Sequence, residues 1–321
     1  MRRLTLAAIL ITSAIVGGVW ARARTNTPSA RLGSSAQCGV YSGLPPEWGA
    51  SPTAGMVHVD GDEFVLGSMH GYADERPAGP VRVAGFFIDR TEVTNAQFAA
   101  FVEATGYVTG AEKSGGAVFR QPTRDTIGDE PWWHYERGAN WRHPDGPPSD
   151  ITNRGNEPVV QLTLEDASAY ARWLGRRLPT EAEWELAARA GVAGAALDGA
   201  PATREGKPAA NFWQGDFPIE NLAQDGYAGR SPVGCFSSNG FGLYDMIGNV
   251  WEWTSDPYRG SHQAQGAPAP AEHEPVEPRV IKGGSYLCAS NFCARHRATA
   301  RHPQDASLST AHVGFRTAKS D

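Results

Sequence analysis

Two cysteines in the C-terminal part of the chain are the residues best suited to chemistry. Cys288 and Cys293 are separated by four residues and follow the segment Gly283-Gly284-Ser285. This spacing differs from the Cys-x-x-Cys pattern of redox and zinc sites. The pair could close a local disulfide in an exported protein, or provide two thiolates for a soft ion such as Cu(I). The spacing alone leaves both interpretations open.

The residues around this pair favour a binding role. The two glycines before it allow the backbone to approach a bound partner closely. Arg295 and Arg297 would help to keep the thiols ionised. We interpret His296, His302 and His312, which follow in the same segment, as surface or hydrogen-bonding residues rather than metal ligands.

Most signatures of other chemistries are absent from the sequence. It contains no phosphate-binding loop, no Gly-x-Ser-x-Gly nucleophile elbow and no Gly-x-Gly-x-x-Gly motif. Its nine histidines include no pair at the i, i+4 spacing of a helical metal site. Asn211, Asp225, Asp245 and Glu252 offer hard oxygen ligands of the kind that Ca²⁺ prefers, although they do not form an EF-hand.

The elements that must position these residues are few and short. Thr94 can cap a helix that ends at Gly106 and carries its apolar side chains on one face. Two further helices, to residue 174 and to about residue 190, are predicted by the capping-box pairs Thr163–Asp166 and Thr180–Glu183.

The remaining sequence predicts short strands and long loops. Residues 57–59 and 63–66 would form strands around an Asp-Gly turn, and residues 81–83 and 86–89 a second strand pair. We expect an ordered loop over residues 107–158, held by Trp132, Trp133 and Trp141, and surface loops over 191–208 and 261–278. Such a chain has no alternating strand–helix pattern, which predicts an irregular α+β domain rather than a doubly wound sheet.

Composition and the N-terminus indicate an exported globular protein. The 321 residues are 40% hydrophobic and 20% charged, and the net charge of −6 argues against a nucleic-acid partner. Arg2 and Arg3 precede an apolar run that ends at a small-x-small site, which predicts a signal peptide or N-terminal anchor over residues 1–23. A flexible linker over residues 24–55 would lead to one domain over 56–321, a monomer that is periplasmic or membrane-anchored.

At the cysteine pair the sequence resembles a known family. Lys282-Gly283-Gly284-Ser285-Tyr286-Leu287-Cys288-Ala289-Ser290-Asn291-Phe292-Cys293 is similar to the active-site segment of formylglycine-generating enzymes, also called sulfatase-modifying factors. Further family motifs follow one another in family order between about residues 56 and 318. They include Asp89-Arg90-Thr91-Glu92-Val93-Thr94-Asn95, Gly138-Ala139-Asn140-Trp141-Arg142-His143-Pro144, Leu178-Pro179-Thr180-Glu181-Ala182-Glu183-Trp184-Glu185, Asn249-Val250-Trp251-Glu252-Trp253 and Gly314-Phe315-Arg316.

The resemblance implies an activity, a metal and a fold. Such enzymes use O₂ to oxidise a cysteine in a sulfatase Cys-x-Pro-x-Arg segment to formylglycine, a post-translational step of sulfatase maturation. By this resemblance Cys288 and Cys293 would hold Cu(I), and Ser285 would form a hydrogen bond in the pocket. Trp251 would shape that pocket or simply pack in the core, and Arg297 would position the substrate. The implied fold is the irregular, C-type-lectin-like fold of this family.

The resemblance also implies two structural calcium sites. The first would comprise Asn211, Phe212, Asp225 and Tyr227, with Phe212 and Tyr227 contributing main-chain oxygens. The second would comprise Asp245, Gly248, Val250 and Glu252, where Asp245 replaces the asparagine of some family members.

Several positions depart from the family pattern. Phe292 stands where some members carry tyrosine, and the four positions that form structural disulfides in animal members are Ala171, Ala188, Ala298 and Thr317. Cys38 and Cys235 remain, and either pair after export or leave Cys235 as a small buried residue. Because some relatives are not enzymes, the alternative function is an exported, non-catalytic binding or assembly module with a Cys288–Cys293 disulfide.

Overall fold

The computed structural model describes residues 32–77, 79–128, 131–192, 206–262 and 277–321. The expected signal peptide or anchor lies outside these ranges, and so do most residues of the two expected surface loops. Within them the longest helix has 11 residues and most strands have four. This confirms the expected α+β fold with little regular structure. No helix in these ranges is long and apolar enough to cross a membrane.

The capped helices form as their sequences predict. In each one a threonine hydroxyl accepts a hydrogen bond from the backbone N–H three residues later, and the side chain of that later residue accepts one from the threonine N–H. The three helices are α2 (Asn95–Thr105), α4 (Leu164–Trp173) and α5 (Glu181–Arg189). Thr94, Thr163 and Thr180 therefore fix where the helices begin.

The first strands do not pair as expected. The strands β1 (Met56–Val59) and β2 (Asp62–Val65) are not a hairpin, and neither are β3 (Pro80–Val83) and β4 (Phe86–Asp89). Instead β1 pairs with β4 and β2 pairs with β3. The reason is burial: β4 carries core side chains and lies between β1 and β11 (Ala318–Ser320), whereas β2 is largely exposed.

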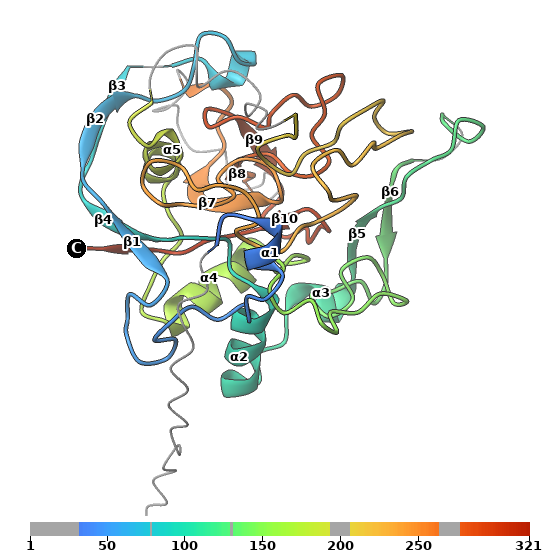
Figure 1. The fold of residues 1–321 in the computed structure, drawn as a ribbon, viewed down its shortest axis with the longest axis horizontal. Helices are drawn as coiled ribbons and strands as arrows, with labels where there is room; N and C mark the ends of the chain where they lie inside the picture. Colours follow the sequence, from blue (N-terminus) through green and yellow to red (C-terminus); the bar gives the residue numbers. More distant parts are fainter. Residues whose placement is uncertain (1–31, 78, 129–130, 193–205, 263–276) are drawn as a thin grey trace, which may run out of the picture.

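A four-stranded sheet lies at the centre of the molecule (Figure 1). Its order is β10-β7-β8-β9, and α5 contacts β7 and β8. The strands are β7 (Trp251–Pro257), β8 (Arg279–Lys282), β9 (Arg301–Gln304) and β10 (Val313–Gly314). Because the cysteine segment leaves β8 directly, this sheet is the platform of the candidate site.

Buried charges join α5 to this sheet. The Lys282 ammonium lies 2.8 Å from Glu185 and 3.6 Å from Glu181, and Arg301 lies 2.8 Å from Glu181. Burial alone would raise the pKa of Glu181, but Lys282, a hydrogen bond from His262 and Arg301 together lower it to about 2. Glu181 is therefore ionised at neutral pH, and its charge holds the last residue of β8 in place.

The segment from residue 107 to 158 is more regular than the expected loop. It contains α3 (Gly110–Ser114) and the antiparallel strands β5 (Gly116–Phe119) and β6 (Trp133–Glu136). These strands form a ribbon at the right-hand edge of Figure 1. Trp141 is 2% exposed and belongs to the main core, so its predicted anchoring role is confirmed.

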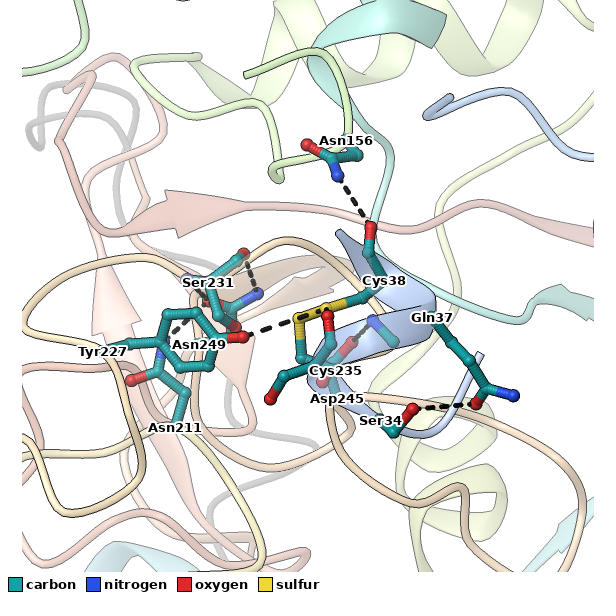
Figure 2. Close-up of a disulfide and its surroundings, with 12 residues drawn as sticks. Ser34, Gln37, Cys38, Asn156, Asn211, Tyr227, Ser231, Cys235, Asp245 and Asn249 are labelled. Atoms are coloured by element: carbon teal, nitrogen blue, oxygen red, sulfur yellow. Dashed lines mark hydrogen bonds between the residues drawn. A yellow bond between two sulfur atoms is a disulfide. The ribbon is translucent and has the colours of Figure 1, made fainter. Parts of the chain in front are cut away.

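The ordered domain also begins earlier than expected. A short helix, α1 (Ser35–Cys38), is tied to the domain by a disulfide between Cys38 and Cys235 (Figure 2). Asn156 donates a hydrogen bond to the Cys38 carbonyl at 2.8 Å, and Thr94 donates one to the Gly43 carbonyl at 2.6 Å. The expected linker over residues 24–55 is therefore too long at its C-terminal end. Its composition is that of a linker, but its cysteine is cross-linked to the domain.

Candidate active site

The cysteine segment turns sharply as it leaves β8. Gly283 and Gly284 have φ angles of 93° and 80°, in the left-handed region that favours glycine. A Cβ on Gly284 would lie 2.7 Å from the Arg295 carbonyl oxygen, so a larger residue would push apart the two ends of the segment. A four-residue turn from Ser285 to Cys288 follows, closed by a 2.9 Å hydrogen bond from the Cys288 N–H to the Ser285 carbonyl.

This turn brings the two thiols together. The Cys288 and Cys293 sulfur atoms are 3.6 Å apart and both thiols are free. The disulfide expected in the alternative interpretation is not formed in this structure. Cys288 is 1% exposed, and its sulfur accepts a hydrogen bond from the Ser285 N–H at 3.4 Å. Cys293 has a φ angle of 50°, so its backbone is held in a conformation that few non-glycine residues adopt.

The two thiols differ in acidity. Burial, followed by the proximity of Cys293, raises the pKa of the Cys288 thiol well above its usual value. The hydrogen bond from Cys288, with help from the Arg295 guanidinium, lowers the pKa of Cys293. Cys293 is therefore the more acidic of the two thiols and is the first to ionise. Two adjacent soft sulfur donors match the chemistry of Cu(I).

A cavity of about 370 Å³ lies over the sulfur atoms. Both cysteines, Ser285 and Trp251 line it, so the structure brings these four predicted residues together. Ser285 is fully buried, and its Oγ accepts a hydrogen bond from the Leu287 N–H at 3.3 Å. Trp251 is 3% exposed, lines the cavity and also belongs to the main core.

One wall of the cavity is aromatic. The Phe292 ring stacks on Phe217 with centroids 4.5 Å apart and packs edge-on against Trp132 at 5.4 Å. Phe292 is 44% exposed, an unusual environment for a large apolar side chain. This wall gives the cavity mouth an apolar surface that a peptide side chain can cover.

Two histidines that the sequence analysis interpreted as surface or hydrogen-bonding residues also line this cavity. His302 on β9 and His312 just before β10 face it together with the cysteines. The His302 ring lies 5.7 Å from Trp251, and the His312 ring lies 4.6 Å from Trp133. The position of β9 beside β8 was needed to find them, because neither lies at a recognisable spacing from the cysteines.

Arg297 does not line the cysteine cavity. Its guanidinium forms two hydrogen bonds with Glu75, at 2.7 and 3.0 Å, and its Nε donates to the Ala294 carbonyl. It borders a separate hollow beside His70, Tyr72 and other residues. In this structure Arg297 supports the cysteine segment through Ala294 and borders this second hollow, and its predicted role in positioning the substrate stays a prediction.

The first predicted calcium site has oxygen atoms that a cation can use. Asn211 is 1% exposed, yet its Oδ1 atom has no hydrogen-bond partner. The Phe212 carbonyl and Asp225 Oδ2 both accept hydrogen bonds from the Gln214 amide, so these two oxygens lie close together. Burial raises the pKa of Asp225, as it would for a carboxylate without a cation.

The second predicted site is partly occupied by protein groups. Both Glu252 oxygens lie 2.6 Å from the Arg316 guanidinium, and Trp184 donates to Oε2. Asp245 is less well compensated, and burial raises its pKa to about 6. Glu92, which the sequence analysis missed, is buried with Oε2 unpartnered, and burial and the charges of Asp245 and Glu252 raise its pKa.

Neither calcium set is a cluster of side-chain ligands alone. Among the described residues no group of three or more His, Cys, Asp or Glu side chains is close enough to hold a metal. Backbone carbonyl and amide oxygens must therefore supply part of either set, as they commonly do for Ca²⁺. The first set, with its unpartnered amide oxygen, fits a cation better than the second.

The structure is an irregular α+β fold with two free thiols, one buried and one partly exposed, beside a cavity. Comparison with known proteins identifies the family of this chain. The family model for the sulfatase-modifying factor enzyme 1-like domain matches residues 41–321. The chain belongs to this family. The match begins upstream of residue 56, in agreement with the ordered N-terminal segment.

Individual relatives agree with this assignment. The chain is 47% identical over 281 residues to a formylglycine-generating enzyme of Streptomyces coelicolor, covering 83% of this chain and 89% of the relative. It is 37% identical to an inactive C-alpha-formylglycine-generating enzyme 2 of Bos taurus, covering 87% and 92%. Its fold is similar to that of PvdO from Pseudomonas aeruginosa, with a TM-score of 0.59, 28% identity and coverage of 83% and 94%.

Proposed function

We propose that this protein is an oxidase that converts a cysteine in a Cys-x-Pro-x-Arg segment of sulfatases to formylglycine with O₂. The observation that carries the proposal is the pair of free thiols 3.6 Å apart beneath a ligand-sized cavity. The relatives at 40–47% identity named formylglycine-generating enzyme support it. The inactive relatives show that the fold alone does not establish activity, so the dithiol has to be tested directly.

Copper(I) is the proposed cofactor, and Cys288 and Cys293 would hold it. When bound, it would bring the substrate thiolate and O₂ into contact in one cavity. Cys293, the more acidic thiol, would provide the negative charge, and the Ser285 N–H orients the sulfur of Cys288. The Ser285 side chain accepts a hydrogen bond from the Leu287 N–H and, as a hydrogen-bond partner of Cys288, acts against the rise in the pKa of that thiol.

The aromatic wall would hold and dry the substrate segment. Trp251, Trp133 and Phe217 line the cavity and exclude water from the reacting sulfur. The exposed ring of Phe292 offers a flat apolar face to the proline of the segment. The net charge of −6 favours a segment that carries arginine and, with it, a flexible or unfolded sulfatase rather than a nucleic acid.

Calcium would serve a structural role. Asn211, Asp225 and the carbonyls of Phe212 and Tyr227 would bind one ion and tie two loops that have few strand hydrogen bonds. Asp245, Glu252 and the carbonyls of Gly248 and Val250 would bind a second, whose charge would offset the surplus of buried carboxylates around Arg316.

Export is the proposed location, either to the periplasm or as a protein anchored by residues 1–23. The Cys38–Cys235 disulfide supports it, because such bonds persist mainly in oxidising compartments. The protein would act there as a monomer.

The test is a reconstitution with purified protein. The full chain is loaded with Cu(I) and incubated with O₂, a reductant and a Cys-x-Pro-x-Arg peptide, and mass spectrometry follows the change from cysteine to formylglycine. A peptide with serine in place of cysteine is the matched control. Absence of aldehyde with copper-loaded, folded protein would overturn the proposal.

The alternative function is a non-catalytic exported module, because some relatives of this chain are named inactive formylglycine-generating enzymes. It requires a persistent Cys288–Cys293 disulfide and no affinity for copper. Thiol titration of the native protein separates the two functions. Two reactive thiols and tight Cu(I) uptake exclude the module, whereas no free thiol and no uptake would support it.

A further inference from the structure

We infer that His302 is a further residue of the substrate site, where its Nε2 atom accepts a hydrogen bond from the thiol of the incoming cysteine. This inference rests on the proposed function, because it concerns how a cysteine peptide is held in the same cavity. His302 lines that cavity together with Cys288 and Cys293.

A backbone contact fixes which ring nitrogen carries the proton. His302 Nδ1 lies 2.7 Å from the Pro303 carbonyl oxygen. Because a carbonyl only accepts, Nδ1 must donate, and in the neutral ring Nε2 is left with a lone pair. The ring therefore offers the cavity an acceptor rather than a donor.

The ring is held rigidly in this position. His302 is in β9, where it pairs with Ile281 of β8, and its ring packs against Trp251. Strand β8 leads directly into the cysteine segment, so the imidazole and the two sulfur atoms are positioned by the same sheet. A group on a sheet holds its geometry better than one on a loop.

The surrounding charges keep the ring neutral. Burial, and then the Arg295 guanidinium, lower the pKa of His302, while the Pro303 carbonyl and Asp74 act weakly in the opposite direction. The neighbouring His312 is also held neutral, because burial lowers its pKa to about 3. The Nε2 lone pair is therefore available at neutral pH.

The other polar groups of the cavity are less suited to this role. The Ser285 Oγ already accepts from Leu287, and the Gln304 amide donates to Leu308. The Thr310 hydroxyl oxygen is buried and has no hydrogen-bond partner among the described residues, but a hydroxyl can rotate and so defines no fixed acceptor. His312 has a buried, unpartnered Nδ1, so no contact fixes its tautomer. Among the nitrogen and oxygen atoms of the cavity, a thiol, a weak donor, would find its best-defined acceptor at His302.

The test is a cycle of two peptides and two substitutions. One peptide carries cysteine in a Cys-x-Pro-x-Arg sequence, and the other carries 2-aminobutyrate, which has a methyl group in place of the thiol. His302→Asn keeps an amide near the position of Nδ1 but has no atom near Nε2, whereas His302→Gln places an amide near Nε2. Binding to the metal-free, full-length protein is measured anaerobically by tryptophan fluorescence, and circular dichroism confirms folding.

His302→Asn is expected to weaken binding of the cysteine peptide by about 3- to 10-fold more than that of the 2-aminobutyrate peptide, the effect of one hydrogen bond. His302→Gln should restore part of the difference. Equal losses for both peptides would overturn the inference and leave the proposed function standing, and so would a difference that follows His312→Asn instead. Failure of the wild-type protein to bind either peptide would overturn both.

Discussion

The protein has two cysteine pairs, one joined in a disulfide and one with two free thiols. Cys38 and Cys235 are 197 residues apart in sequence and are joined, whereas Cys288 and Cys293 are close in sequence, with sulfur atoms 3.6 Å apart, and remain free. Proximity is therefore not what separates a cross-link from a binding site in this chain. The free pair lies beneath a cavity, the Arg295 guanidinium lowers the pKa of Cys293, and the Ser285 N–H donates a hydrogen bond to the Cys288 sulfur. These features suit two sulfur atoms that bind a ligand.

Removing either sulfur of the free pair should have the largest effect. Cys293→Ser or Cys288→Ser is expected to reduce formylglycine formation by more than about 100-fold. Losing a residue that only supports a metal ligand typically costs up to roughly 100-fold, and here one of the two proposed ligands is lost, so that only one sulfur is left to hold the ion. Peptide mass spectrometry measures the turnover. The melting temperature should change little, and a variant that retained substantial turnover would remove the distinction between the pairs.

Removing the cross-linked pair should act on stability instead. The double substitution Cys38→Ala and Cys235→Ala is expected to lower the free energy of unfolding by about 2–5 kcal/mol, since the unfolded chain gains the freedom of a very long loop. Thermal or denaturant unfolding measures the loss. Turnover below the new melting temperature should be close to that of the wild type, and a loss of activity without a loss of stability would contradict this assignment.

Calcium removal should affect the same region with a similar or smaller effect. One saturated site at 100 times its dissociation constant adds about 2.7 kcal/mol, and chelation should remove it. The Cys38 sulfur lies 3.8 Å from the Tyr227 hydroxyl (Figure 2), and the Gly234 N–H donates to Asp245 at 2.5 Å. The disulfide and the proposed calcium ions would therefore hold adjoining loops. Chelation should lower the melting temperature more in the double variant than in the wild type, and Ca²⁺ but not Mg²⁺ should restore it.

An additive result, in which chelation lowers both melting temperatures equally, would mean that the disulfide and the ions stabilise separate loops. Glu252→Gln tests the second site in the same assay, although its ion pair with Arg316 also contributes to stability. Identical curves for calcium-supplied protein and for protein stripped of metal by chelator would mean that calcium does not stabilise this fold.

The smallest expected effect concerns reactivity within the free pair. The pKa of Cys293 is lowered, first by the Cys288 hydrogen bond and then by Arg295, so its thiolate persists to lower pH than that of an ordinary cysteine. Alkylation of the native protein should label Cys293 and spare Cys288, whose pKa is raised. Cys288→Ala should shift the pH profile of labelling upwards, and Arg295→Met should shift it by less. Mass spectrometry of the labelled peptides over pH 5–9 measures this.

Sequence reasoning succeeded where the signal was local. The caps at Thr94, Thr163 and Thr180 fixed three helices, because one side chain and one backbone N–H decide where a helix begins. The proximity of Cys288 and Cys293 followed from a short segment with glycines at its start. Family resemblance added Ser285 and Trp251, which line the same cavity.

It failed where distant segments decide. Strand β4 pairs with β1 on one side and with β11, near the end of the sequence, on the other. The residues of the nearby turns do not predict this arrangement. His302 and His312 face the cavity only because β9 lies beside β8 and β10 beside β7. Residues 32–55 look like a linker by composition, yet their single cysteine finds its partner nearly 200 residues later.

The position of β11 has a consequence for the order in which the protein can be built. This strand, at residues 318–320, completes the sheet that β1 and β4 begin, and Arg316 just before it supplies the buried charge opposite Glu252. A ribosome or a translocation pore releases the N-terminal half long before these residues emerge. The first sheet therefore cannot be completed until then, and the apolar side chains of Phe86 and Ile88, which are buried in the folded protein, are not yet fully covered. Because this pairing joins residues far apart in sequence, it also makes folding slow. A protein of this design needs protection from aggregation during synthesis more than after it.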